Sequence, residues 1–199
     1  MNLANKLTIF RIILVPVMML VPVLGLNQEL WGIPLTYLII DLIFIIASIT
    51  DKLDGYIARS RNQITTFGKF LDPIADKILV IVAMLMLVGS GKIPYWIPAI
   101  VVIREFMVSG YRLVAVQKNG NVIAASIWGK IKTATQMVGL ILAFVDKNVF
   151  GAIFTSNLTG FDFALNLIVT IMLSISVVAT IVSGVDYLKG SKEIFKDSK

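Results

Sequence analysis

Cysteine and histidine are both absent from the 199 residues of this chain. Their absence excludes a disulfide, a thiol nucleophile, a Ser-His-Asp triad and a histidine-based zinc site. Charge is scarce as well, since Asp, Glu, Lys and Arg make up only 15% of the residues, against about 25% in ordinary soluble domains. Metal binding and acid–base chemistry therefore fall mainly to Asp, Glu, Lys and Tyr.

Apolar residues, by contrast, make up 57% of the chain, and the mean hydropathy is +0.88. A soluble domain of this size cannot bury that much apolar surface, so the surrounding solvent is expected to be lipid. Unpaired backbone amides are not tolerated in hydrocarbon, and strand-like alternation is absent, which favours helices. Six apolar segments approach the length of a spanning helix, at about 20 residues, and they occupy 9–26, 34–50, 74–88, 93–116, 131–145 and 163–185. The sequence predicts one all-α integral membrane domain over 1–199, with six transmembrane helices and the first segment retained rather than cleaved.

The basic residues set the expected orientation. All but Lys92 and Lys147 of the 18 lysines and arginines fall in the N-terminal segment, in the regions 52–77 and 104–132, or in the C-terminal tail. The positive-inside rule then places both termini and both basic loops in the cytoplasm, as in a multi-pass protein of the cell membrane. The net charge of +6 is explained by topology and anionic lipid, so no nucleic-acid partner is expected.

Four aspartates form the most informative cluster. Asp51 and Asp54 end the second apolar segment, and Asp72 and Asp76 begin the third. Spacings of three and four residues put each pair on one helix face. Both pairs are expected at the cytoplasmic edge of the bilayer, in a polar active-site cavity level with the lipid phosphates.

Four clustered carboxylates cannot all stay ionised without a cation among them. Lys52, Lys77 and Arg59 are nearby candidates, and hard divalent ions such as Mg²⁺ or Mn²⁺ are stronger ones, two of which would balance the four charges. A salt-bridged loop without chemistry is the alternative. A cation transporter is less favoured, because its carboxylates lie near the bilayer midplane.

Residues 51–76 read D-x-x-D-G-x-x-A-R, then eight residues, then G-x-x-x-D-x-x-x-D. This resembles the signature of the CDP-alcohol phosphatidyltransferase family, with all eight fixed positions at the family's spacing. Residues 4–11 resemble the family's N-terminal segment P-N-x-L-T-x-x-R, with Ala4 in the place of the proline. The stretches 66–77 and 122–133 resemble the branch whose acceptor is glycerol 3-phosphate.

The resemblance implies that the chain transfers a phosphatidyl group from CDP-diacylglycerol to glycerol 3-phosphate, giving phosphatidylglycerophosphate and CMP. It implies that Asp51, Asp54, Asp72 and Asp76 hold the metal ions and that Asp76 is also the general base. Contacts with the CDP-lipid are expected from Gly55, Ala58, Arg59, Thr65, Gly68, Asn5 and Thr8. The acceptor phosphate needs a basic pocket, for which the candidates are Arg112, Lys130 and Lys132. A homodimer is a further implication of the resemblance.

Several alternatives stay open. Serine or an inositol phosphate would use the same aspartates, because these handle the CDP-lipid that all family members share. The small residues also suit plain helix packing, and a structural scaffold would need no chemistry. Arg104 is expected to pair within the bundle beside Glu105, and Asp41 to have a buried polar partner.

Overall fold

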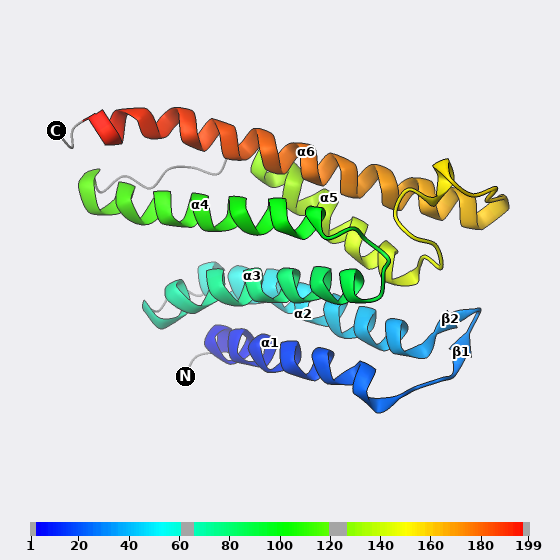
Figure 1. Ribbon diagram of the computed structural model, residues 1–199. Helices are drawn as coiled ribbons and strands as arrows, with labels where there is room; N and C mark the ends of the chain where they lie inside the picture. Colours follow the sequence, from blue (N-terminus) through cyan, green and yellow to red (C-terminus); the bar gives the residue numbers. More distant parts are fainter. Residues whose placement is uncertain (1–2, 61–65, 120–126, 197–199) are drawn as a thin grey trace.

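The computed structural model describes residues 3–60, 66–119 and 127–196, apart from the side chains at 3–4, 52, 54, 56–60, 66–67, 69–70, 112–119 and 190–196. Within these ranges, six long α-helices run along a common direction (Figure 1). The elements in chain order are α1 (Leu3–Leu20), the 3-10 turn η1 (Val21–Leu24), β1 (Glu29–Leu30), β2 (Ile33–Pro34), α2 (Leu35–Ser60), α3 (Thr66–Gly89), α4 (Trp96–Asn119), α5 (Ile127–Val145), the 3-10 turn η2 (Ala152–Phe154) and α6 (Gly160–Lys196).

Each of the six apolar segments lies largely within one helix, but several helices extend beyond their segments. Helix α2 continues past Thr50 to Ser60, and α3 already begins at Thr66. Once a helix is nucleated, each further residue adds a backbone hydrogen bond, so the helix extends past the point where apolar residues give way to polar ones. Asp51 and Asp72 therefore lie inside helices that continue beyond the apolar segments.

A two-stranded hairpin joins α1 to α2, which the all-α prediction did not include. Glu29 pairs with Pro34 and Leu30 with Ile33. The turn residues Trp31 and Gly32 have φ of 56° and 74°, the pair of positive values that a type I′ turn requires. Two-residue strands are too short to show an alternating pattern in the sequence.

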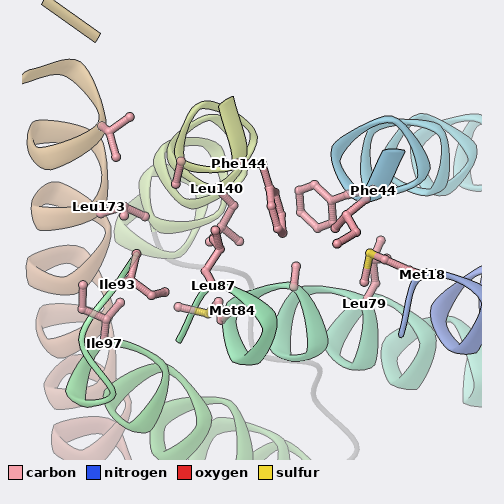
Figure 2. Packing of buried hydrophobic residues seen from close by; sticks show 14 of the residues in the cluster. Met18, Phe44, Leu79, Met84, Leu87, Ile93, Ile97, Leu140, Phe144 and Leu173 are labelled. Atoms are coloured by element: carbon pink, nitrogen blue, oxygen red, sulfur yellow. The ribbon is translucent and has the colours of Figure 1, made fainter. Parts of the chain in front are cut away.

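The helices pack around one apolar core. Helix α1 packs on α2 and α3, while α6 packs on α5 and α4. Between these groups, buried side chains from all six helices meet, and the rings of Phe44 and Phe144 lie 6.3 Å apart between α2 and α5 (Figure 2). Large apolar residues also cover the outside, for example Ile13, Ile171 and Val178. Such an exterior is typical of a protein in contact with lipid.

Two stretches of the described chain, Asn5–Leu24 and Gly160–Lys189, are long and apolar enough to cross a membrane by length and composition. Together with the apolar exterior they mark a membrane-associated helical protein. The start of α1 and the end of α6 lie at the same end of the bundle, here called the end that carries the termini, and the β1–β2 hairpin lies at the other (Figure 1). The exposed aromatic residues Trp31 and Tyr95 are in the hairpin turn and the α3–α4 connection.

Lys92, one of the two basic residues outside the basic regions, lies in the turn between α3 and α4 and is buried. Its ammonium group donates hydrogen bonds to the carbonyl oxygens of Ala143, Phe144 and Asp146, at 3.2, 2.8 and 2.6 Å. It thereby satisfies carbonyls at the C-terminus of α5, which have no partners within their own helix. Burial lowers the pKa of Lys92 to about 8, against the opposing effect of the Asp146 and Asp41 carboxylates.

Asp41 of α2 is buried, as the sequence led us to expect. Its Oδ1 atom has no hydrogen-bond partner among the described residues. Its polar neighbour is the charge of Lys92, with which it interacts electrostatically. Lys92 also lies over the ring of Tyr37, 4.4 Å from its centroid. A single lysine therefore serves the last turn of α5 and a buried carboxylate of α2.

Replacing this lysine is expected to destabilise the protein. Lys92→Met leaves three carbonyl oxygens without a donor and the Asp41 carboxylate without its counter-charge, at a cost of about 3 kcal/mol. Thermal unfolding in detergent measures the loss. Lys147→Met is the matched control, since Lys147 is the other basic residue of this end and is exposed. Equal unfolding temperatures for Lys92→Met and Lys147→Met would contradict this account of Lys92.

Candidate active site

Asp51 of α2 pairs with Arg11 of α1 near the end of the bundle that carries the termini. Arg11 Nη1 lies 2.5 Å from Asp51 Oδ1. The arginine side chain is completely buried, whereas the aspartate side chain is 37% exposed. The carboxylate is thus held from the protein side and remains accessible on the other. The sequence had suggested Lys52, Lys77 and Arg59 as counter-charges. The Lys77 ammonium instead donates to the Ser109 hydroxyl, and the other two side chains lie outside the described residues.

Asp72 of α3 is also held by α1. The Thr8 hydroxyl donates a hydrogen bond to Asp72 Oδ1 at 2.7 Å. Thr8 and Arg11 are three residues apart and so lie on one face of α1. Asn5, one turn earlier on that helix, is buried as well, as is Gly68 on α3, one turn before Asp72. Helix α1 therefore positions one carboxylate on each of the two motif helices.

Asp76 lies one turn after Asp72 on α3, and charged side chains from four other helices act on it. It interacts electrostatically with Asp51, Arg11, Lys132 and Glu105. These come from α2, α1, α5 and α4 in that order. Residues far apart in the sequence thus surround one carboxylate.

Asp76 also lines a small polar cavity between α3, α4 and α5. The other polar residues of its wall are Lys77, Glu105, Lys132 and Gln136, with Thr133 at its edge. Acidic, basic and amide groups inside an otherwise apolar bundle are costly and generally functional. The cavity is therefore our candidate for the reaction site.

An apolar groove adjoins this cavity on the far side of α5. It lies between α2 and α5, has a volume of about 620 Å³, and is lined mainly by Ile45, Ile49, Ala134, Val138 and Ile141. Thr133 and Met137 line both the groove and the cavity. Lys130 and Ser48 add polar groups to the groove. The groove and the cavity therefore share part of their walls along α5.

Lys130 and Lys132, the two lysines predicted to bind the acceptor phosphate, face different spaces in the structure. Lys132 is buried and faces the cavity that holds Asp76, whereas Lys130 is exposed and lines the groove. Gly55 is half-buried on α2. Thr65 and the side chains of Asp54, Ala58, Arg59 and Arg112 lie outside the described residues, so their predicted roles stay predictions.

Two cavity residues had not been assigned to the site from the sequence. Gln136 is buried, and its amide donates a hydrogen bond to Met84 Sδ at 3.2 Å. Glu105 had been considered only as the neighbour of Arg104, and that pairing is confirmed at 2.8 Å. Both are polar residues within apolar segments, and this is the signal that could have identified them.

The chemistry of these side chains fits a divalent cation. No group of three acidic side chains with metal-binding geometry is found in the part of the chain that the structure describes, which does not include the Asp54 side chain. Carboxylate oxygens are nevertheless the ligands that Mg²⁺ and Mn²⁺ prefer. The Asp51 and Asp76 charges also repel each other, and a cation between α2 and α3 would relieve that repulsion.

An apolar helical bundle with partly buried carboxylates on α2, α3 and α4 around a polar cavity defines a class of membrane-associated protein with a polar site inside the helices. Within this class, the chain belongs to the CDP-alcohol phosphatidyltransferase family, whose profile matches residues 1–182. Members of this family generally depend on a divalent metal ion.

The chain is similar over nearly its whole length to curated proteins named CDP-diacylglycerol–glycerol-3-phosphate 3-phosphatidyltransferase. It is 38% identical to the one from Bacillus subtilis, over 99% of this chain and 98% of the relative. It is 38% identical to the one from Rickettsia bellii, over 98% and 97%. With the protein of that name from Haemophilus influenzae it shares 42% identity over 70% and 73%.

The hydrogen bond from Thr8 to Asp72 yields a test of the metal site. Thr8→Val keeps the shape of the side chain but removes the hydroxyl, and is expected to weaken Mn²⁺ binding about tenfold. Thr8→Ser keeps the hydroxyl and is expected to bind Mn²⁺ like the unmodified protein. Titration calorimetry of the purified protein in detergent measures both affinities. Equal affinities for the valine and serine variants would show that Thr8 does not support the metal site.

Proposed function

We propose that this chain is a phosphatidylglycerophosphate synthase, which transfers the phosphatidyl group of CDP-diacylglycerol to glycerol 3-phosphate and releases CMP. The observation that carries the proposal is the convergence of charged residues at Asp76: it lines one cavity with the buried Lys132 and interacts electrostatically with Asp51, although the three come from different helices. The names of the full-length relatives support the same donor and acceptor.

The six long helices cross the cell membrane in this proposal. The basic residues near the end that carries both termini then face the cytoplasm, following the positive-inside rule. The site opens to the same side, where the water-soluble acceptor glycerol 3-phosphate is available and CMP is released. A homodimer is part of the proposal, and light scattering of the detergent-solubilised protein tests it.

Asp51, Asp54, Asp72 and Asp76 would hold two divalent ions, Mg²⁺ or Mn²⁺. When bound, such ions neutralise the negative charge of the diphosphate and of the departing CMP. Arg11 and Thr8 do not bind the ions themselves; they hold the Asp51 and Asp72 carboxylates in position from α1. The positions of these side chains are thus set before any substrate arrives.

Asp76 accepts the proton of the attacking hydroxyl of glycerol 3-phosphate. It lines the cavity beside Lys132, whose ammonium group binds the phosphate of the acceptor, with Arg112 and Lys130 as further basic residues. A carboxylate is a weak base for an alcohol, so the proton is transferred only as the new bond to phosphorus forms. The hydroxyl oxygen bonds to the lipid-bearing phosphorus, and the bond from that phosphorus to CMP breaks.

The donor lies across α2 and α5. Its acyl chains occupy the apolar groove, and its diphosphate lies near Asp51 and Asp72. Gly55, Ala58, Arg59, Thr65 and Gly68 contact the CDP moiety, together with Asn5 and Thr8. Because Thr133 borders both the groove and the cavity, donor and acceptor meet beside the first turns of α5.

Acceptor choice is the first test. The purified protein with CDP-diacylglycerol and Mg²⁺ is expected to release CMP with glycerol 3-phosphate, but not with serine or an inositol phosphate. Thin-layer chromatography of the lipid product and CMP quantification measure this. If CMP is released with serine or an inositol phosphate but not with glycerol 3-phosphate, the assignment of glycerol 3-phosphate as the acceptor is wrong. Divalent cation flux in liposomes without CMP release would instead favour a transporter.

Asp76 supplies the second test. Asp76→Asn keeps the size of the side chain but cannot accept the proton, so turnover is expected to fall by about 10²–10⁴. Asp186→Asn is the matched control, since Asp186 is an exposed carboxylate of α6, and it is expected to retain full turnover. Unfolding temperatures of both variants check the fold. Undiminished turnover of a folded Asp76→Asn variant would refute its role as the base.

A further inference from the structure

Glu105 of α4 joins three helices near the candidate active site. Its Oε1 atom accepts hydrogen bonds from Lys132 Nζ of α5 at 2.7 Å and from Arg104 Nη1 at 2.8 Å. The second arm of the Arg104 guanidinium donates to Ser183 Oγ of α6 at 2.6 Å. The Arg104 guanidinium also lies 5.8 Å from the ring centroid of Tyr187 on α6. A continuous polar chain therefore runs from α6 through α4 to the lysine in the cavity.

This chain is shielded from solvent. The side chains of Lys132, Glu105 and Arg104 are only 9%, 14% and 12% exposed. Hydrogen bonds between ionised groups are roughly twice as strong as neutral ones, and a low local dielectric strengthens them further. The ammonium of Lys132 is consequently fixed in one place, although a free lysine side chain has many rotamers.

The position of the Lys132 ammonium group determines which carboxylate of the cavity it pairs with. Two carboxylates, Asp76 and Glu105, line the cavity with Lys132, and Lys132 interacts electrostatically with both. Its hydrogen bond goes to Glu105 on the α4 wall, and the described residues donate no hydrogen bond to Asp76. A lysine released from Glu105 would turn towards the other carboxylate of the cavity, Asp76.

We propose that Glu105 is a positioning residue, which holds Lys132 on the α4 wall of the cavity to receive the phosphate of the acceptor and keeps its ammonium group away from Asp76. This inference rests on the proposed function, because it assigns Lys132 to the acceptor. Arg104 supports Glu105 from behind by tying the carboxylate to α6. Glu105 itself touches no reacting atom.

The consequence is selective for one substrate. Loss of Glu105 frees Lys132 and weakens acceptor binding, whereas the donor contacts α2, α3 and the apolar groove. The KM for glycerol 3-phosphate is therefore expected to rise about tenfold or more in Glu105→Ala. The KM for CDP-diacylglycerol is expected to change less than twofold. A merely structural defect would affect both substrates alike.

A double-mutant cycle tests this directly. Glu105→Ala, Lys132→Met and the double variant are compared by initial rates at varied glycerol 3-phosphate. If Glu105 acts only through Lys132, the double variant has the acceptor KM of Lys132→Met alone, because the two effects are not additive. Phe106→Leu is the control on the same helix, since Phe106 is exposed on the outside, and it is expected to leave both KM values unchanged.

Glu105→Asp keeps the charge and is expected to restore part of the acceptor affinity. Glu105→Gln keeps the size of the side chain but removes its charge. It replaces Glu105→Ala in the kinetic comparison if the alanine variant does not fold. Acceptor KM effects that multiply in the double variant would overturn the inference, as would an unchanged acceptor KM in folded Glu105 variants. If the unmodified protein releases no CMP with glycerol 3-phosphate, the proposed function fails; if it does so and only the Glu105 expectations fail, the inference alone is wrong.

Discussion

The ion pair between Arg11 and Asp51 is the interaction on which the site depends. A guanidinium group that is completely buried costs several kcal/mol to remove from water, and only a close carboxylate compensates for that cost. The pair consequently fixes α1 against α2. Thr8, on the same face of α1, then fixes Asp72 of α3. The first helix of the chain is thus the support on which both halves of the aspartate motif are placed.

Polar groups near the two ends of the bundle differ in how completely they are hydrogen-bonded and charge-paired. Near the hairpin end, Lys92 and Asp146 have hydrogen-bond partners in the backbone and among the side chains. The Asp146 carboxylate accepts hydrogen bonds from the side-chain amides of Asn166 and Asn148. The Asn166 side-chain oxygen accepts a hydrogen bond from the backbone amide of Ile153. Nearer the termini, carboxylates repel one another beside a cavity. Carboxylates that repel one another beside a cavity are typical of a site that binds a cation, whereas the hydrogen-bonded network around Lys92 and Asp146 is typical of structural support.

Hydropathy and motif spacing were sufficient to predict six helices and the placement of the aspartates on two neighbouring helices. They could not locate the helix ends, because hydropathy marks where apolar residues stop and not where the backbone hydrogen bonds stop. Thr66 and Ser60 therefore lie well outside the predicted segments.

The side-chain partners were harder to predict. Arg11 is the arginine of the N-terminal segment that resembles the family, but only the packing of α1 reveals its pairing with Asp51. Lys130 and Lys132 were grouped because they belong to the same side of the membrane. Two residues apart on a helix means about 200° around its axis, so this spacing already implied that they face different spaces. Glu105 and Gln136 were visible only as polar interruptions of apolar segments.

The central claim is that α2 and α3 gather their aspartates around divalent ions near the end of the bundle that carries both termini. A structure of the protein prepared with Mn²⁺, in which anomalous scattering locates the metal, tests it most directly. The account predicts anomalous peaks between α2 and α3, ligated by Asp51, Asp72 and Asp76 together with Asp54. Peaks confined to other parts of the protein, or carboxylates that point away from one another with Mn²⁺ in excess, would contradict it.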